Sequence, residues 1–156
     1  MRPEQMRPFV ESTIEVFQQM LGVRLREGAG KVTGTQEGDF DLSAFIGLSG
    51  KATASFVLSA SSLTARRIVG AMLRETADTE LDLADGMGEF INIIAGTACR
   101  KLGRLGFEGL ALSLPAVVSG THRVIWPSRE IPGLSLCVLD SELGSLSIEV
   151  NMRSAS

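Results

Sequence analysis

The sequence has one histidine, His122, and only two cysteines, Cys99 and Cys137. With one histidine there is no histidine pair, so we expect no metal site, and we expect His122 in a loop. The two cysteines lie far apart, each in an apolar run, and no secretory leader precedes them. This pattern fits a reducing compartment, so we expect two small buried thiols and a cytoplasmic location.

The chain also lacks long apolar runs and any excess of basic residues. No run approaches the roughly 18 apolar residues that a membrane-spanning helix needs, so we expect no membrane insertion. The net charge of −3 gives no basic surface for nucleic acid, and the arginines at 66–67 and 100–104 are interpreted as solvated helix faces. With 156 residues, 44% of them hydrophobic, we expect one domain spanning 1–156.

Apolar residues at helical spacing predict three helices. Pro8 is expected in the first turn of the first helix, where its missing N–H removes no helical hydrogen bond. In the second helix we expect Ile68, Ala71 and Met72 to face inward. The predicted helices are Pro8–Leu21, Leu63–Glu75 and Leu81–Leu105, the last of them capped by Thr79 or Asp82.

Alternating apolar residues predict two β-hairpins. The first covers 40–58 and turns at Gly50, and the second pairs Leu134–Asp140 with Leu146–Met152. The stretch 109–120 indicates a strand interrupted by Pro115, which places it at an edge or a bulge.

Two connecting stretches and the overall class complete this outline. One more edge strand is expected at Val23–Glu27 or at Gly30–Gln36, and 121–133 is expected to be a loop. The two hairpins look like weak copies of each other. The fold class is therefore α+β, an antiparallel sheet with helices packed on it and a weak internal pseudo-repeat.

The longest predicted helix carries a polar stripe opposite its apolar face. Because successive helical residues turn by about 100°, Asp85, Glu89, Asn92 and Gly96 fall on one arc. The apolar residues Met87, Ile91, Ile94, Ala98 and Leu102 fall on the opposite arc. A mid-helix asparagine is a poor helix former, since its amide competes for backbone hydrogen bonds.

This stripe has two interpretations. The simpler one is a solvated polar face of an amphipathic helix. The other is a site: Gly86, Gly88 and Gly96 would let a partner approach, and the side chains have complementary chemistry. A carboxylate can bind a cation beside a phosphoryl group, and a neutral amide can orient an attacking water without repelling the phosphate.

Four positions of the sequence resemble a family signature. Asp85, Glu89, Asn92 and Pro115 match the pattern D-x3-E-x2-N-x22-P of the CheC/CheX family of chemotaxis phosphatases. The surrounding words GEFINIIAGTA and SLPAVVSG, and the first helix PFVESTIEVFQQMLGV, are similar to that family as well. A single motif and a short chain resemble the CheX branch.

The resemblance implies a specific activity. Members of the family hydrolyse the aspartyl phosphate of CheY-like receiver domains, so Glu89 is implied to contact the receiver's lysine and Asn92 to position the water. Asp85, Gly96 and Pro115 are implied to be structural, with Asp85 as a hydrogen-bond acceptor at the helix start. No cofactor of its own is implied, because Mg²⁺ belongs to the receiver, and a homodimer joined through the sheets is implied.

Two alternatives stay open beside this activity. The chain could be a non-catalytic binding or scaffold module of the same fold, related to the flagellar-switch proteins FliM and FliN. In addition, Glu15 and Gln18 on the first helix are a distant echo of the E-x-x-N pair. Because the asparagine is replaced there, we interpret that helix as an inactive, packing element.

Overall fold

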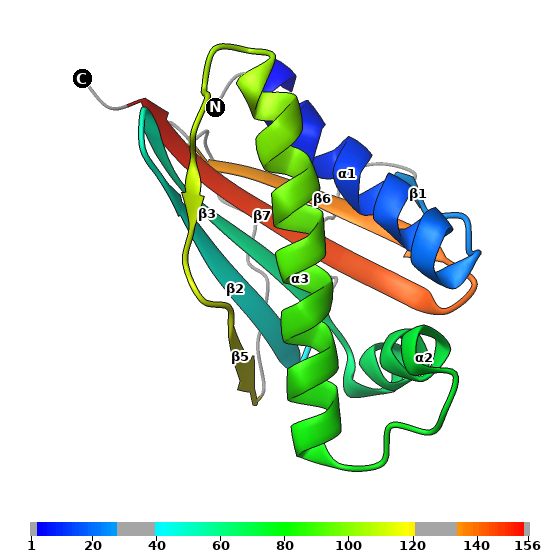
Figure 1. The fold of residues 1–156 in the computed structure, drawn as a ribbon. Coiled ribbons are helices and arrows are strands. Elements are labelled where there is room, and N and C mark those ends of the chain that lie inside the picture. The colour runs from blue at the N-terminus through cyan, green and yellow to red at the C-terminus, as the bar shows by residue number, and fades with distance from the viewer. Residues whose placement is uncertain (1–2, 28–39, 121–133, 155–156) are drawn as a thin grey trace.

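The computed structural model describes residues 3–27, 40–120 and 134–154, and Figure 1 shows their arrangement. Two long helices cross one face of a single antiparallel sheet, and a shorter helix lies beside one end of the longest. The elements are α1 (Pro3–Leu21), β1 (Arg26–Glu27), β2 (Leu42–Ser49), β3 (Ala52–Ala60), α2 (Ser62–Leu73), α3 (Glu80–Gly103), β4 (Ala111–Leu112), β5 (Ala116–Ser119), β6 (Leu134–Ser141) and β7 (Gly144–Ser154).

Both halves of the chain contribute strands to both sides of the sheet. Its order is β1-β6-β7-β3-β2-β4, and β5 also pairs with β2. Each half supplies a long helix, one or two short strands and a hairpin. The second strands of the hairpins pair at the centre, where Phe56 lies opposite Val150. The short strand β1 of the first half joins β6 of the second, and β5 of the second joins β2 of the first. The predicted fold class, with its weak pseudo-repeat, is confirmed.

The core lies between the sheet and the two long helices. Phe9 of α1 packs on Phe56 of β3 with ring centroids 5.2 Å apart, and Phe17 of α1 meets Phe90 of α3 at 5.9 Å. All four rings are fully buried. Aromatic pairs at these separations stabilise a core beyond the area they bury. They join α1, α3 and the centre of the sheet into one cluster.

Both predicted hairpins are present. The first turns at Gly50, whose φ of 144° falls in a region that favours glycine. Pro115 separates β4 from β5, as predicted. The expected edge strand is the two-residue β1, inside the first of the two alternatives; the second, Gly30–Gln36, lies outside the described residues. The loop predicted for 121–133, with His122, also lies outside them.

Three predictions about the helices and thiols were wrong. Helix α1 begins at Pro3, so Pro8 lies inside it. The lost hydrogen bond at Pro8 is tolerated because Phe9 and Val10 bury their side chains in the core. Ala71 is exposed, since it lies roughly 90° from the centre of the buried face of α2 at 100° per residue. The two cysteines are only half-buried.

Candidate active site on helix α3

The start of α3 is fixed by a side-chain cap. The Thr79 hydroxyl accepts a hydrogen bond from the Asp82 N–H at 3.0 Å, so Thr79 is the cap and Asp82 is not. Such caps satisfy backbone donors that a helix leaves free, and each stabilises by about 1 kcal/mol. Acidic residues follow in the first turn, and Arg100 and Lys101 occupy the last turn, as the helix dipole favours.

The two faces of α3 match the prediction. Every residue expected on the apolar arc is fully buried, namely Met87, Ile91, Ile94, Ala98 and Leu102. On the opposite arc, Asp85 and Glu89 are exposed, and Asn92 and Gly96 are half-buried. Asp85 lies in the second turn and has no hydrogen bond to another described side chain, so the role of acceptor at the helix start belongs to Thr79.

The glycines of α3 serve two different purposes. A Cβ on Gly86 would lie 2.5 Å from Cγ1 of Val69, so this glycine lets α2 pack closely on α3. Gly88 is buried as well, and its absent Cβ would contact Pro115 and Val117. The expectation that these two glycines leave room for a partner was therefore wrong, because the chain itself occupies the space. Among the glycines of α3, only Gly96 has no described atom within 4 Å of its Cβ position.

Pro115 lies against the polar stripe because the chain before it is anchored. The hydroxyl of Ser113 accepts a hydrogen bond from the Gly47 N–H at 2.8 Å, and the Ser113 N–H donates to the Gly47 carbonyl at 2.8 Å. This double link holds the segment between β4 and β5 on β2. Pro115 and Val117 then face α3 across Gly88.

A hollow of about 470 Å³ opens between α3 and this segment. Its lining residues are Ala84, Asp85, Gly88, Glu89, Pro115 and Val117. Asn92 lies outside it, one turn further along the same face of α3. The hollow thus joins three of the positions in the D-x3-E-x2-N-x22-P pattern, and its apolar wall was not recognised in the sequence.

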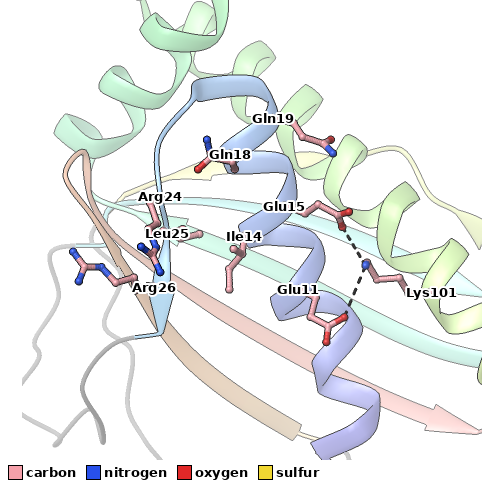
Figure 2. Close-up of a pocket in the computed structure, with 9 residues that line it drawn as sticks. All are labelled: Glu11, Ile14, Glu15, Gln18, Gln19, Arg24, Leu25, Arg26 and Lys101. Atoms are coloured by element: carbon pink, nitrogen blue, oxygen red, sulfur yellow. Dashed lines mark ion pairs between the residues drawn. The ribbon is translucent and has the colours of Figure 1, made fainter.

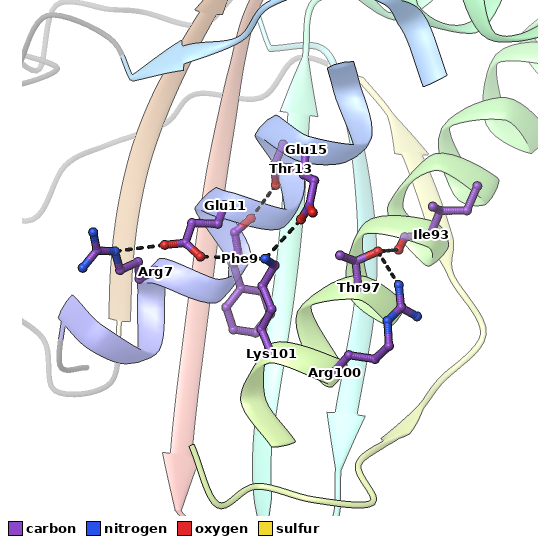
Figure 3. Close-up of polar contacts among 9 residues, drawn as sticks. All are labelled: Arg7, Phe9, Glu11, Thr13, Glu15, Ile93, Thr97, Arg100 and Lys101. Carbon is purple, nitrogen blue, oxygen red and sulfur yellow. Dashed lines mark hydrogen bonds and ion pairs between the residues drawn. The ribbon is translucent and has the colours of Figure 1, made fainter. Parts of the chain in front are cut away.

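The carboxylate of Glu89 is available to a partner. Within the described part of the chain, no ion pair or side-chain hydrogen bond involves Glu89 or Asn92. The nearby Arg100 instead donates to Thr97 at 3.2 Å, and Thr97 donates to the Ile93 carbonyl (Figure 3). The pair therefore consists of an exposed anion and a half-buried amide, a combination that can bind a cation and orient a water molecule.

Glu15 and Gln18 on α1, which resemble the E-x-x-N pair, are arranged differently. Lys101 of α3 lies between the two helices, with its Nζ 3.1 Å from Glu15 and 3.8 Å from Glu11 (Figures 2 and 3). Glu15 is thus paired within the chain, whereas no described residue pairs with Glu89. This contact supports the interpretation of α1 as a packing helix.

A hollow larger than the one at the polar stripe lies beside α1. It measures about 730 Å³ and lies between α1, the segment 24–26 and Lys101 (Figure 2). Glu11 and Glu15 line one side, and Arg24 and Arg26 line the other. Because its carboxylates are paired with Lys101, we place the candidate site at Glu89 and Asn92 instead. Among the described residues, no cluster of three or more metal-binding side chains occurs.

Comparison with known sequences identifies the family. The sequence profile described as "Chemotaxis phosphatase CheX" matches residues 42–135, which include the whole polar stripe and Pro115. The chain belongs to the CheX family. Its sequence is 29% identical over 143 residues to the CheY-P phosphatase CheX of Thermotoga maritima, covering 90% of this chain and 92% of that protein.

Solved structures of CheX proteins have the same fold. The chemotaxis protein CheX of Vibrio vulnificus matches with a TM-score of 0.80 and 26% identity, covering 98% of this chain and 99% of that one. CheX from Borrelia burgdorferi, solved in a complex with CheY, BeF3 and Mg²⁺, matches with a TM-score of 0.72 and 20% identity, covering 98% and 100%. In the part of the chain that the structure describes, no helix has both the length and the apolar character required to cross a membrane.

Proposed function

We propose that this member of the CheX family hydrolyses the aspartyl phosphate of a CheY-like receiver domain. The carrying observation is the pair on α3, in which Glu89 is exposed, has no partner among the described residues and lies one turn from Asn92. The family match and the relative described as a CheY-P phosphatase support the reaction class. The complex of a related CheX with CheY supports the kind of partner.

In this mechanism the chain supplies positioning rather than a nucleophile. Glu89 binds the lysine beside the phosphorylated aspartate and so fixes α3 in the receiver's site. Asn92 accepts and donates hydrogen bonds without carrying charge, so it orients a water in line with the phosphorus–oxygen bond that breaks. Water attacks phosphorus, the aspartate oxygen leaves, and inorganic phosphate forms. The Mg²⁺ that neutralises charge on the phosphoryl group belongs to the receiver.

The test measures phosphate release from a phosphorylated receiver with three variants of the chain. Asn92→Ala should lower the rate at saturating receiver on the order of 100-fold, as expected for a lost transition-state hydrogen bond. It should still bind a receiver carrying BeF3. Glu89→Gln should mainly weaken binding, because removing one partner of a desolvated charge pair costs about 2–5 kcal/mol.

Gln18→Ala is the matched control. It removes the same kind of amide from an exposed helix face on α1 and should leave the rate unchanged. If phosphate release by Asn92→Ala equals that of the wild type, the catalytic role is wrong. Binding of the receiver without hydrolysis would instead indicate the scaffold function.

Two further features belong to this proposal. We infer a homodimer joined at the β5 edge, because β5 pairs only with β2 among the described strands and Val118 there is 56% exposed. Phe45 on the adjacent strand is also exposed. We infer a cytoplasmic location from the free thiols of Cys99 and Cys137, which suit a reducing compartment.

A further inference from the structure

A second hollow lies directly beside the proposed site. It measures about 320 Å³ and is bounded by the start of α3, α2, the first residue of β2, and β5. Ala84 and Val117 line both this hollow and the one that contains Glu89. The two hollows therefore form one continuous surface along the N-terminal half of α3.

The second hollow has an apolar floor and a mixed rim. Leu42 and Leu83 on the floor are almost fully buried, and Val117 is half-buried. Arg66 of α2 and Glu80 of α3 are exposed residues that also line the hollow. Concave apolar surfaces with a few charged groups at the edge are typical of binding sites for partner side chains.

The walls of this hollow are held in place before any partner binds. The carboxylate of Asp41 accepts hydrogen bonds from the N–H of Ser62 at 2.5 Å and from its hydroxyl at 2.8 Å. The Asp41 carbonyl accepts from the Gly120 N–H at 2.9 Å. One residue thus links the start of β2, the first turn of α2 and the end of β5. A preformed site loses less conformational entropy on binding.

Leu81 is the unusual residue of the rim. It lies in the first turn of α3 with 69% of its surface exposed, although it borders an apolar hollow. Single exposed leucines are common on protein surfaces. Leu81 differs because it extends an apolar surface that continues to Glu89. Eight residues separate the two positions, which corresponds to about 12 Å along the helix.

A receiver bound at Glu89 is large enough to extend over these roughly 12 Å to Leu81. Receiver domains have a doubly wound α/β fold, in which the reactive group lies at the carboxyl ends of the strands, surrounded by loops and helix starts. A typical protein interface covers about 800 Å² on each partner, which extends well beyond 12 Å from its centre. A receiver placed with its lysine on Glu89 therefore also covers the second hollow.

We propose that the hollow bordered by Leu81 receives an apolar side chain of the receiver domain, taken from a loop or helix start next to the phosphorylated aspartate. Leu81 then determines which receiver binds, whereas Asn92 determines how fast the phosphate leaves. This inference rests on the proposed phosphatase function and assigns a separate residue to partner choice.

The experiment measures the dissociation constant for a BeF3-bound receiver and the rate of phosphate release at saturation. Leu81→Ala should raise the dissociation constant about 10-fold, as for a moderate interface contact, with an unchanged rate at saturation. Ser119→Trp, at an exposed position that lines the same hollow, should weaken binding as well by filling it. Leu63→Ala is the matched control: Leu63 is 57% exposed on α2, does not line the hollow, and should change neither quantity.

The outcomes separate this inference from the function it rests on. If Leu81→Ala and Ser119→Trp bind the receiver as tightly as the wild type while Asn92→Ala loses activity, the docking role is wrong and the phosphatase function stands. A lower rate at saturation with unchanged affinity would also overturn it. If Asn92→Ala is fully active but Leu81→Ala loses affinity, the docking role holds and the catalytic role of Asn92 fails.

Discussion

Replacing Gly96 with alanine should stabilise α3 but weaken its binding to the receiver. Apart from Gly96, its two neighbours and the backbone of its own helix, no atom of the described residues lies within 4 Å of the Cβ position. Alanine inside a helix is favoured over glycine by about 0.8–1.0 kcal/mol, so Gly96→Ala should raise the free energy of unfolding by that amount. For a chain of this size the melting temperature should rise by about 2–4 °C.

The same substitution should weaken binding of the receiver. Gly96 follows Asn92 by one helical turn on the polar stripe, so a methyl group there lies where the receiver must approach. We expect weaker binding of the BeF3-bound receiver by the more stable protein. Thermal unfolding followed by circular dichroism gives the first quantity, and receiver titration gives the second. A protein that is destabilised by Gly96→Ala would refute the open surface at this position.

Gly86 provides the internal comparison. Its added Cβ would lie 2.5 and 2.7 Å from the two methyl groups of Val69. Overpacking of this kind costs about 1–3 kcal/mol, which exceeds or cancels the gain in helix propensity. Gly86→Ala should therefore be neutral or destabilising. Combined with Val69→Ala, the loss should be smaller than the sum of the single losses, because the new methyl fills the space that valine leaves.

Two further predictions concern the sheet. Burial raises the pKa of the Cys137 thiol from 9.0 to about 11, and the Glu27 carboxylate adds to this effect. A thiol-specific reagent should react slowly with native Cys137 at pH 8 and faster as the pH approaches 11, and fast reaction at pH 8 would contradict the burial. Because the unfolded thiol ionises first, stability should fall as the pH rises from 9 to 11, and Cys137→Ser should reduce that slope. For the proposed dimer, Val118→Lys should shift the molar mass in solution from dimer to monomer, while Leu63→Lys should not; a dimer that persists in Val118→Lys would place the interface elsewhere.

Local patterns in the sequence predicted most of the fold. The hairpins and the two faces of α3 depend on residues within a few positions of one another, so alternation and helical spacing were enough to predict them. The local rule for the position of proline in a helix failed, because packing in the core decided where the helix begins. Pro8 was expected in the first turn, yet α1 begins five residues earlier because apolar side chains on both sides of Pro8 are buried.

The same division between local sequence pattern and packing applies to the candidate site. Spacing alone put Glu89 and Asn92 on one exposed face, and the match at Asp85 and Pro115 pointed to the family. The structure decided which carboxylate is available, since Lys101 pairs with Glu15 and leaves Glu89 without a partner among the described residues. It also assigned Gly86 and Gly88 to internal packing and Gly96 to an open surface.

The sequence by itself therefore determined the elements, the polar stripe and its chemistry, because these follow from periodicity along one segment. Only the tertiary structure determined what lies opposite that stripe. Pro115 reaches the stripe through the edge of β2, and Val69 of α2 packs on the buried Gly86 beside it. Contacts of that kind depend on where whole elements come to lie, and no spacing within α3 encodes them.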